Sequence, residues 1–359
     1  MNRWANVGRA YGTREMSDGG ACLPNADTWE TRMNTITKSP ADLEALKQQA
    51  LRLARMAREE DLGQRGDITS ALAMPGPTLS TQDSELRTPA SVLTDASVVA
   101  PSTFRLLAKQ PGVFAGREIA AEVLSVFDNH VRLRWAEAGR DGARIEKPPL
   151  HLATLTGPAG AILAAERTLL NFLQRLCGIA TATRRYVDAV EGTLARIMDT
   201  RKTTPGWRVL EKYAVRCGGG DNHRMGLYDA ILIKDNHLAG IPPERLAQAV
   251  FEMLNRAEGL SPHPDFVEVE ADTLAQVERL LTIVGINVIL LDNFRVEDIR
   301  AAVRLRDDLN LRGKVEFEVS GGVRLETVRA VAETGVERIS VGAITHSAPA
   351  IDLSLERAG

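Results

Sequence analysis

Charged and hydroxyl side chains gather in two stretches that each lie beside a run of apolar residues. The first, DTRKTTPG, begins at Asp199 and places Arg201 and Lys202 among three threonines. Arginine presents a planar fork that matches a carboxylate or a phosphate, and lysine presents a compact point charge. The stretch therefore predicts an anion clamp, and a solvated loop is the simpler alternative when the stretch is taken alone.

The second stretch, GGGDNHRMGLYDAILIKDNH (residues 218–237), adds His223, Arg224 and Lys234 to the candidate cations. Its three glycines predict a tight, left-handed or closely packed backbone, because a helix C-cap would need only one of them. Cys217 directly before them is interpreted as a buried structural thiol, since no base is assigned to it. Lys234 ends the apolar run AILI, where a lysine either extends to solvent or points into the mouth of a barrel.

Two acidic residues, Glu270 and Asp292, close the next two apolar runs. Carboxylates beside several cations can balance charge, hold Mg²⁺ together with bound waters, or stabilise a developing positive charge. The alternative is structural, because Glu268 and Glu270 alternate and either residue could be an exposed strand position.

A glycine pair at 321–322 follows Ser320 and precedes a predicted helix. Glycines that open a helix after a strand expose backbone N–H groups to a phosphate. Gly342 and His346 could form the other wall of this phosphate site, since phosphate sites after the last strands are common in (β/α) barrels.

The elements that must position these residues alternate between strand and helix from about residue 190 onward. Six short apolar runs are predicted strands, within 194–200, 229–237, 265–272, 287–294, 314–322 and 338–347. Such alternation predicts right-handed crossovers and a parallel sheet buried on both faces. Polar groups close nearly every strand, which favours a (β/α) barrel over a doubly wound sheet with a single switch point. About six strands are fewer than eight, so we expect an incomplete barrel.

The N-terminal half predicts a smaller α/β domain. A helix begins near residue 39, capped by Ser39 or Asp42, and short alternating segments then predict a small sheet with a helix on it. A long helical region at 161–192 follows, with an expected break near Gly178. The expected organisation is a flexible tail (1–38), an α/β sandwich domain (39–160) with an exposed loop insertion (75–97), a barrel domain (161–345) and a C-terminal segment (346–359).

Composition limits the function classes. The chain has 359 residues and a net charge of −3, so no overall basic field favours nucleic acid or a membrane. No apolar run approaches the length of a membrane span. Three cysteines without a Cys-x-x-Cys pair argue against a disulfide framework and a zinc site, so we expect a cytoplasmic protein.

The combined motifs resemble the quinolinate phosphoribosyltransferase family. The matching stretches run from about residue 59 to the C-terminus and include EDLGQRGDITS, AERTLLNFLQRLCGIAT, DTRKTTPG, GGGDNHR with IKDNH, VEVEAD, ILLDNF and EVSGGV. The tail, the 75–97 stretch and EKPPLHLATLTGP depart from the family pattern, and none of them touches the site motifs. The resemblance implies an N-terminal open α/β sandwich, an incomplete barrel, and conversion of quinolinate and phosphoribosyl pyrophosphate into nicotinate mononucleotide, pyrophosphate and CO₂, with Mg²⁺, in NAD biosynthesis.

The resemblance also implies a role for each matching residue. Quinolinate would be held by Arg167, Thr200, Arg201, His223 and Arg224. Lys202 and Lys234 would face pyrophosphate or substrate, and Glu270 and Asp292 would lie by the ribose and Mg²⁺, so that these four form the expected catalytic set. The 5′-phosphate would be held by Ser320, Gly321, Gly322, Gly342 and His346. Arg167 precedes the first barrel strand, and the family pattern implies that it enters the neighbouring subunit's site in a homodimer, with a hexamer left open.

Two alternatives stay open at the level of sequence. A paralogue with the same fold could act on another heterocyclic carboxylate, and substrate turnover would separate the two. A catalytically silent protein that binds phosphorylated metabolites is the alternative from another class. The full set of charged strand ends argues against a catalytically silent protein. Tight binding without pyrophosphate release would support such a protein.

Overall fold

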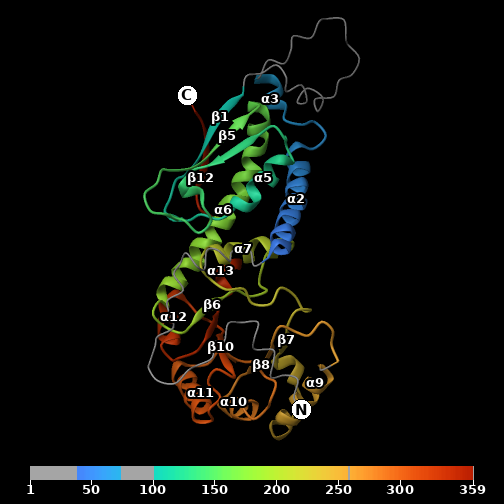
Figure 1. The fold of residues 1–359 in the computed structure, drawn as a ribbon, viewed down its shortest axis with the longest axis vertical. Coiled ribbons are helices and arrows are strands. Elements are labelled where there is room, and N and C mark those ends of the chain that lie inside the picture. Colours follow the sequence, from blue (N-terminus) through green and yellow to red (C-terminus); the bar gives the residue numbers. More distant parts are fainter. Residues whose placement is uncertain (1–38, 74–100, 258, 359) are drawn as a thin grey trace, which may run out of the picture. The chain divides into compact units, whose positions relative to one another are not determined.

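The computed structural model describes residues 39–73, 101–257 and 259–358. The predicted tail and the predicted insertion lie outside these residues. The described residues form two compact units (Figure 1), and we treat each by itself. The sandwich unit contains 39–73, 101–184, 203–219 and 343–358, and the barrel unit contains 185–202, 220–257 and 259–342.

An antiparallel sheet in the order β12-β1-β5-β3 forms the centre of the sandwich unit. Its strands are β1 (Ser102–Ala108), β3 (Arg132–Trp135), β5 (Leu150–Gly157) and β12 (Leu353–Arg357), and the short pair β2 (Gly112–Val113) and β4 (Arg144–Ile145) forms a second sheet. The last strand therefore completes the N-terminal sheet, because β12 pairs with β1 along its whole length. The helices of this unit are α2 (Pro40–Leu62), α3 (Ile68–Ala73), α5 (Arg117–Ser125), η2 (Glu137–Gly139), α6 (Ala159–Ala189, up to residue 184), α7 (Arg208–Cys217) and α13 (Ala343–His346).

Helix α2 begins where the sequence predicts. The Ser39 hydroxyl accepts the Asp42 backbone N–H at 3.1 Å, and Pro40 occupies the first turn, where its missing N–H costs nothing. Leu46, Ala50 and Ala54 are buried at a spacing of four, so one stripe of the helix faces the core.

The expected break of the long helix at Gly178 is wrong. Helix α6 runs without interruption for 31 residues. A Cβ at position 178 would lie 2.1 Å from the carbonyl oxygen of Pro349 and 3.1 Å from the Cα of Ala350. Gly178 is therefore needed for close approach of the C-terminal segment to the helix and does not interrupt it.

Six parallel strands form the sheet of the barrel unit, in the order β6-β11-β10-β9-β8-β7. They are β6 (Arg196–Met198), β7 (Ile231–Ile233), β8 (Val267–Ala271), β9 (Val288–Asp292), β10 (Glu316–Ser320) and β11 (Arg338–Ser340). Strands β6 and β7 are consecutive in the sequence, but they lie at opposite edges of the sheet. The barrel is therefore open between these two strands. The predicted fold class, an incomplete parallel (β/α) barrel with an N-terminal α/β open-sandwich domain, is confirmed. The structure adds that the sheet of the N-terminal domain is antiparallel.

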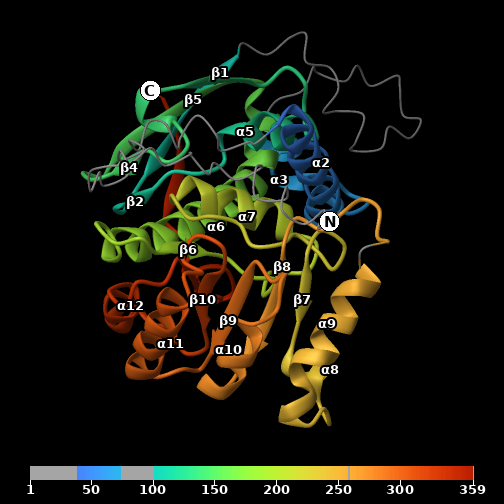
Figure 2. The same ribbon diagram turned by 60° about the horizontal axis from the view of Figure 1, so that its bottom comes forward.

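Helices cover one face of this sheet. They are α8 (Asp235–Leu238), η3 (Pro243–Arg245), α9 (Leu246–Ala257), α10 (Leu274–Leu280), α11 (Val296–Asp308) and α12 (Leu325–Ala332). Figure 2 shows α9, α10 and α11 alongside the strands of the barrel unit. Phe317 of β10 faces α11, because the Arg306 guanidinium of that helix stacks 5.1 Å from its ring centroid. Alternate residues of the strands face away from the helices.

The predicted helix between the first two barrel strands is α7, and it belongs to the sandwich unit. Its C-terminal glycines behave as expected: Gly218 lies where a Cβ would meet the Ala180 carbonyl oxygen at 2.5 Å, and Gly219 has φ 87°. Cys217 is buried, and burial raises the pKa of its thiol well above the ordinary value. The interpretation of Cys217 as a buried thiol is confirmed.

Candidate active site

The predicted site residues of the barrel unit follow the carboxyl ends of its six strands. Because the strands are parallel, these ends meet at one edge of the sheet. Thr200, Arg201 and Lys202 follow β6, and Lys234 follows β7. Glu270 is the second-last residue of β8, and Asp292 is the last residue of β9. Ser320 is the last residue of β10 and is followed by Gly321 and Gly322, and Gly342 follows β11.

Lys234 and Glu270 form an ion pair at this edge, with 3.1 Å between Nζ and Oε2. Burial raises the pKa of Glu270, and the hydrogen bond from Lys234 opposes that rise. The ammonium group of Lys234 and the carboxylate of Glu270 therefore hold each other in place at the carboxyl ends of the strands.

Three carboxylates, Glu270, Asp272 and Asp292, bring one oxygen each within 4.8 Å of the others. Hard oxygen donors are the ligands that Mg²⁺ prefers, usually with one or two carboxylates and several waters. The donor set therefore fits Mg²⁺, and it includes Asp272, which was not among the residues predicted from the sequence.

The carboxylate of Asp292 is fixed from both sides. Ser320 donates its hydroxyl to Oδ1 at 2.5 Å, and the Asn293 amide donates to Oδ2 at 2.6 Å. Gly321 has φ 86°, and a Cβ there would lie 2.2 Å from the Asn293 side-chain oxygen. The first glycine of the pair is thus required for contact with Asn293, and only Gly322 has open space around it.

Cations lie beside the first strand. Arg201 and Lys202 are exposed, whereas Arg224 is buried. Burial lowers the pKa of the Arg224 guanidinium, and the nearby Arg201 lowers it further. Two neighbouring guanidinium groups, of which Arg224 is buried and Arg201 exposed, predict a site for an anion with more than one negative charge.

Asp199 anchors the loop that carries these cations. It is fully buried, its Oδ1 accepts the His223 backbone N–H at 2.8 Å, and its Oδ2 accepts from the Asn222 amide at 2.6 Å. A parallel bridge between Met198 and Asp221 continues this attachment. The DNHR segment is therefore held along β6, next to the TRK segment that follows this strand.

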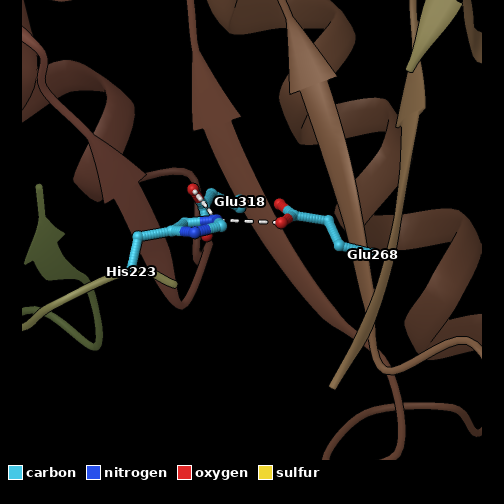
Figure 3. A group of neighbouring side chains, drawn as sticks. All are labelled: His223, Glu268 and Glu318. Atoms are coloured by element: carbon cyan, nitrogen blue, oxygen red, sulfur yellow. Dashed lines mark hydrogen bonds and ion pairs between the residues drawn. The ribbon is translucent and has the colours of Figure 1, made fainter. Parts of the chain in front are cut away.

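The imidazole of His223 lies between two buried glutamates (Figure 3). Its Nε2 is 2.9 Å from Oε2 of Glu268 and 3.4 Å from Oε1 of Glu318. Its Nδ1 accepts the backbone N–H of Arg224 at 2.8 Å, so Nε2 carries the hydrogen and faces the glutamates as a donor. A metal ion would need a lone pair on Nε2, so this trio does not fit a metal site.

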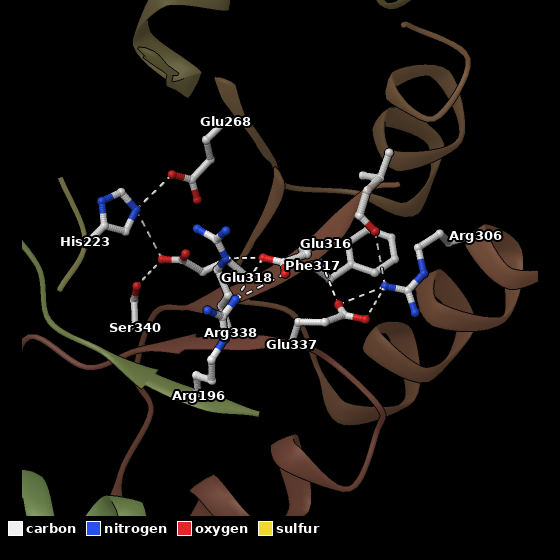
Figure 4. A network of polar contacts seen from close by, with 11 residues as sticks. Arg196, His223, Glu268, Arg306, Glu316, Phe317, Glu318, Glu337, Arg338 and Ser340 are labelled. Carbon is white, nitrogen blue, oxygen red and sulfur yellow. Dashed lines mark hydrogen bonds and ion pairs between the residues drawn. The ribbon is translucent and has the colours of Figure 1, made fainter. Parts of the chain in front are cut away.

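A wider network surrounds this trio (Figure 4). Ser340 donates a short hydrogen bond to Glu318, and Arg338 pairs with Glu316, which also binds Arg196. Burial raises the pKa of Glu268 and of Glu318 to about 7 each. Charged residues thus occupy the strand face that apolar residues usually fill inside such a barrel.

The possible exposure of Glu268 is wrong, since its side chain is fully buried. The sequence contains a sign of this arrangement, because VEVEA and EFEVS place acidic residues at every second position of strands expected to be buried on both faces. Four residues of this network were not among the site residues predicted from the sequence: Glu268, Glu318, Arg338 and Ser340.

Two predicted site residues belong to the sandwich unit. Arg167 is an exposed residue of α6, and His346 is an exposed residue at the end of α13, where its Nδ1 lies 2.6 Å from the Ser347 hydroxyl. Their contacts with substrate stay predictions, as do those of the residues at the strand ends.

Comparison with known proteins adds the family. The sequence matches the model described as quinolinate phosphoribosyl transferase, C-terminal domain, over residues 179–356, and the corresponding N-terminal domain over residues 92–177. The chain belongs to the quinolinate phosphoribosyltransferase family. Among curated relatives, a probable nicotinate-nucleotide pyrophosphorylase [carboxylating] of Bacillus subtilis (strain 168) is 41% identical over 251 residues, which cover 70% of this chain and 82% of the relative.

Further members agree with this assignment. A nicotinate-nucleotide pyrophosphorylase [carboxylating] of Mycobacterium leprae (strain TN) is 42% identical over 76% of this chain and 93% of the relative. The solved nicotinate-nucleotide pyrophosphorylase from Francisella tularensis is 35% identical, with a TM-score of 0.71 over 90% of this chain and 99% of that chain. Within the described residues, no helix of this family member is long and apolar enough to cross a membrane.

Proposed function

We propose that this chain transfers a phosphoribosyl group from phosphoribosyl pyrophosphate to quinolinate, with decarboxylation, to give nicotinate mononucleotide, pyrophosphate and CO₂ in NAD biosynthesis. The observation that carries the proposal is the collection of cations and carboxylates at the ends of β6 to β9, beside the serine and glycines at the ends of β10 and β11, in a chain whose relatives are named for this reaction. Quinolinate is a dianion and the other substrate is a polyanion, so both need local cations in a protein with a net charge of −3.

The residues of the barrel unit divide the work between the two substrates. Arg201 and Arg224 hold the carboxylates of quinolinate, since two neighbouring guanidinium groups match two negative charges. Lys202 and Lys234 face the pyrophosphate. Ser320, Gly322 and Gly342, at the ends of β10 and β11, are proposed to hold the 5′-phosphate, since backbone N–H groups there can donate hydrogen bonds to its oxygens.

Carboxylates stabilise the charge that develops at the ribose. Departure of pyrophosphate leaves a cation-like ribose carbon, and Glu270 and Asp292 place negative charge at the strand ends to meet it. Mg²⁺ on Glu270, Asp292 and Asp272 would neutralise part of the charge on pyrophosphate. The protein otherwise orients the substrates, and ribosylation of the ring nitrogen supplies the positive charge that decarboxylation requires.

A homodimer with shared sites is part of the same proposal. Arg167 lies on α6, in the sandwich unit, and we propose that it reaches the quinolinate carboxylates of the partner subunit. The sequence contains three cysteines without paired spacing, which favours a reducing compartment such as the cytoplasm.

The test is an assay of the purified protein with quinolinate, phosphoribosyl pyrophosphate and Mg²⁺. Nicotinate mononucleotide, pyrophosphate and CO₂ should form in equal amounts. Tight binding of both substrates without release of pyrophosphate would overturn the proposal, and so would turnover confined to a different heterocyclic carboxylate.

A further inference from the structure

We infer that Glu268 and Glu318 are positioning residues for the proposed reaction: together they hold the His223 imidazole, and through it they set the Arg224 main chain and the guanidinium that meets quinolinate. This inference rests on the proposed function. We call Glu268, Glu318 and His223 the imidazole clamp.

The first step is the tautomer of His223. The backbone N–H of Arg224 points at Nδ1 over 2.8 Å, so Nδ1 must present a lone pair. The single N–H of the neutral ring is then on Nε2, which lies 2.9 Å from Glu268 and 3.4 Å from Glu318. Both ring nitrogens are thus bonded to groups of the protein. The prediction that His223 itself contacts quinolinate stays a prediction, and the structure assigns the ring a role through Arg224.

The second step connects the ring to Arg224. The His223 imidazole accepts the backbone N–H of Arg224. At the far end of the Arg224 side chain, Nη1 donates to the Ala230 carbonyl oxygen at 3.1 Å. Arg224 is therefore held both at its backbone and at its guanidinium group. If the ring turns, the Arg224 backbone loses its acceptor and the guanidinium can shift by the fraction of an ångström that matters for a carboxylate.

The third step is the rigidity of the clamp. Glu268 lies on β8 and Glu318 on β10, and Ser340 of β11 fixes Glu318 with a short hydrogen bond. Phe266 packs its ring against the imidazole edge to face, with centroids 5.4 Å apart. Arg338 lies over the same Phe266 ring at 5.3 Å and pairs with Glu316. Neighbouring strands thus fix the position of the ring.

The fourth step is energetic. Both clamp glutamates are buried, and within the described residues Oε1 of Glu268 and Oε2 of Glu318 have no hydrogen-bond partner. Buried carboxylates with incomplete hydrogen bonding destabilise a fold. The inward-facing positions of barrel strands are ordinarily occupied by branched apolar side chains. Such a departure from good packing is expected where function requires it.

The experiment combines histidine ¹⁵N NMR with kinetics on the full chain. The sequence contains six histidines, so selective labelling gives few signals, and a His223→Gln variant assigns the one of interest. We expect a neutral His223 at pH 7 that is protonated on Nε2. A ring protonated on Nδ1, or on both nitrogens, would overturn the inference.

The kinetic arm compares Glu268→Leu, which removes the acceptor, with Glu268→Gln, which keeps one. Glu268→Leu should raise KM for quinolinate about tenfold or more and leave KM for phosphoribosyl pyrophosphate unchanged. Glu268→Gln should stay within about threefold of wild type. The matched control is Glu337→Gln, since Glu337 likewise accepts from a buried side chain, the guanidinium of Arg306, and among the described residues has no hydrogen bond or ion pair with His223.

The outcomes separate the clamp from a structural role and from the proposed function. Equal changes in both KM values after Glu268→Leu would overturn the clamp, and so would a fall in Vmax with both KM values unchanged, as for a general loss of folded protein. Absence of turnover in the wild type would contradict the proposed function instead. The NMR arm needs no turnover and would still support or overturn the geometry of the clamp.

Discussion

At the scale of the residue, the site is a set of charges that hold one another in place. Lys234 and Glu270 pair at 3.1 Å, Asp292 is fixed by Ser320 and Asn293, and Asp199 holds the main chain of His223. Charges arranged before substrate arrives need little reorganisation during the reaction. This arrangement makes the effect of single substitutions predictable.

Removal of the Lys234 ammonium should disable the enzyme and leave the fold intact. Lys234 follows β7 and is half exposed, so Lys234→Ala leaves no cavity in the core. We expect kcat/KM to fall at least about 100-fold, because a group that stabilises developing charge is lost. Steady-state kinetics checks this, with Lys314→Ala, an exposed lysine before β10, as the control. Near wild-type activity of Lys234→Ala would remove the lysine from the site.

Glu318 should make stability depend on pH. Burial raises its pKa from 4.5 to about 7, so between these values the folded protein keeps a proton that the unfolded chain has released. The free energy of unfolding therefore falls as pH rises through this window, by on the order of 1–3 kcal/mol for such a shift. Glu268, with a pKa of about 7, and Asp141, with a pKa of about 6, contribute with the same sign.

Thermal unfolding of the wild type and of Glu318→Gln between pH 5 and 8 tests this expectation. The amide takes up no proton, so the decline in Tm with rising pH should be shallower in the variant. Identical slopes in the two proteins would show that Glu318 does not titrate in this window.

At the scale of the element, the strand ends were predictable and the strand interiors were not. Six apolar runs followed by polar residues predicted both the parallel sheet and the edge at which Lys234, Glu270 and Asp292 lie. The positions of Glu268 and Glu318 were not predicted, because an acidic residue within a strand is more often exposed than buried. Their burial depends on His223, which comes from a distant part of the chain.

Helix α6 illustrates the same limit. Local propensity predicts a break at Gly178, since glycine weakens a helix interior. The reason for the glycine lies about 170 residues away in the sequence, where the backbone at Pro349 and Ala350 packs on the helix. A contact between residues so far apart in the sequence cannot be predicted from the residues around Gly178.

Gly178→Ala should therefore destabilise the protein, although alanine favours helices. The added Cβ would lie 2.1 Å from the Pro349 carbonyl oxygen, and backbone must move to admit it. We expect a loss of about 1–3 kcal/mol in the free energy of unfolding, measured by chemical denaturation. The control is Gly259→Ala, where a Cβ meets nothing within 4 Å. A stabilised Gly178→Ala would contradict the packing role.

At the scale of the whole molecule, we propose that two chains share each site. Arg167 belongs to the sandwich unit and the strand-end residues belong to the barrel unit, and the proposed homodimer supplies Arg167 from the partner subunit. In a twofold dimer, each chain would contribute to both sites.

Mixing two inactive variants tests this sharing. Arg167→Ala and Lys234→Ala should each be inactive alone. After subunit exchange, half of the dimers are mixed, and one of the two sites in each mixed dimer is fully wild type. Roughly a quarter of wild-type activity should then return. No recovery, with exchange verified by differently tagged chains, would place Arg167 in its own chain's site or outside the site.

The most direct measurement of the central claim is the ratio of kcat/KM for quinolinate to that for nicotinate, each with saturating phosphoribosyl pyrophosphate. Nicotinate lacks one carboxylate, so it leaves part of the cation set at the strand ends without a partner in a desolvated site, and such mismatches give large discrimination. We expect quinolinate to be favoured at least about 1,000-fold, with CO₂ released once per nucleotide formed. Comparable efficiency with the two substrates, or nucleotide formed from quinolinate without CO₂, would contradict it.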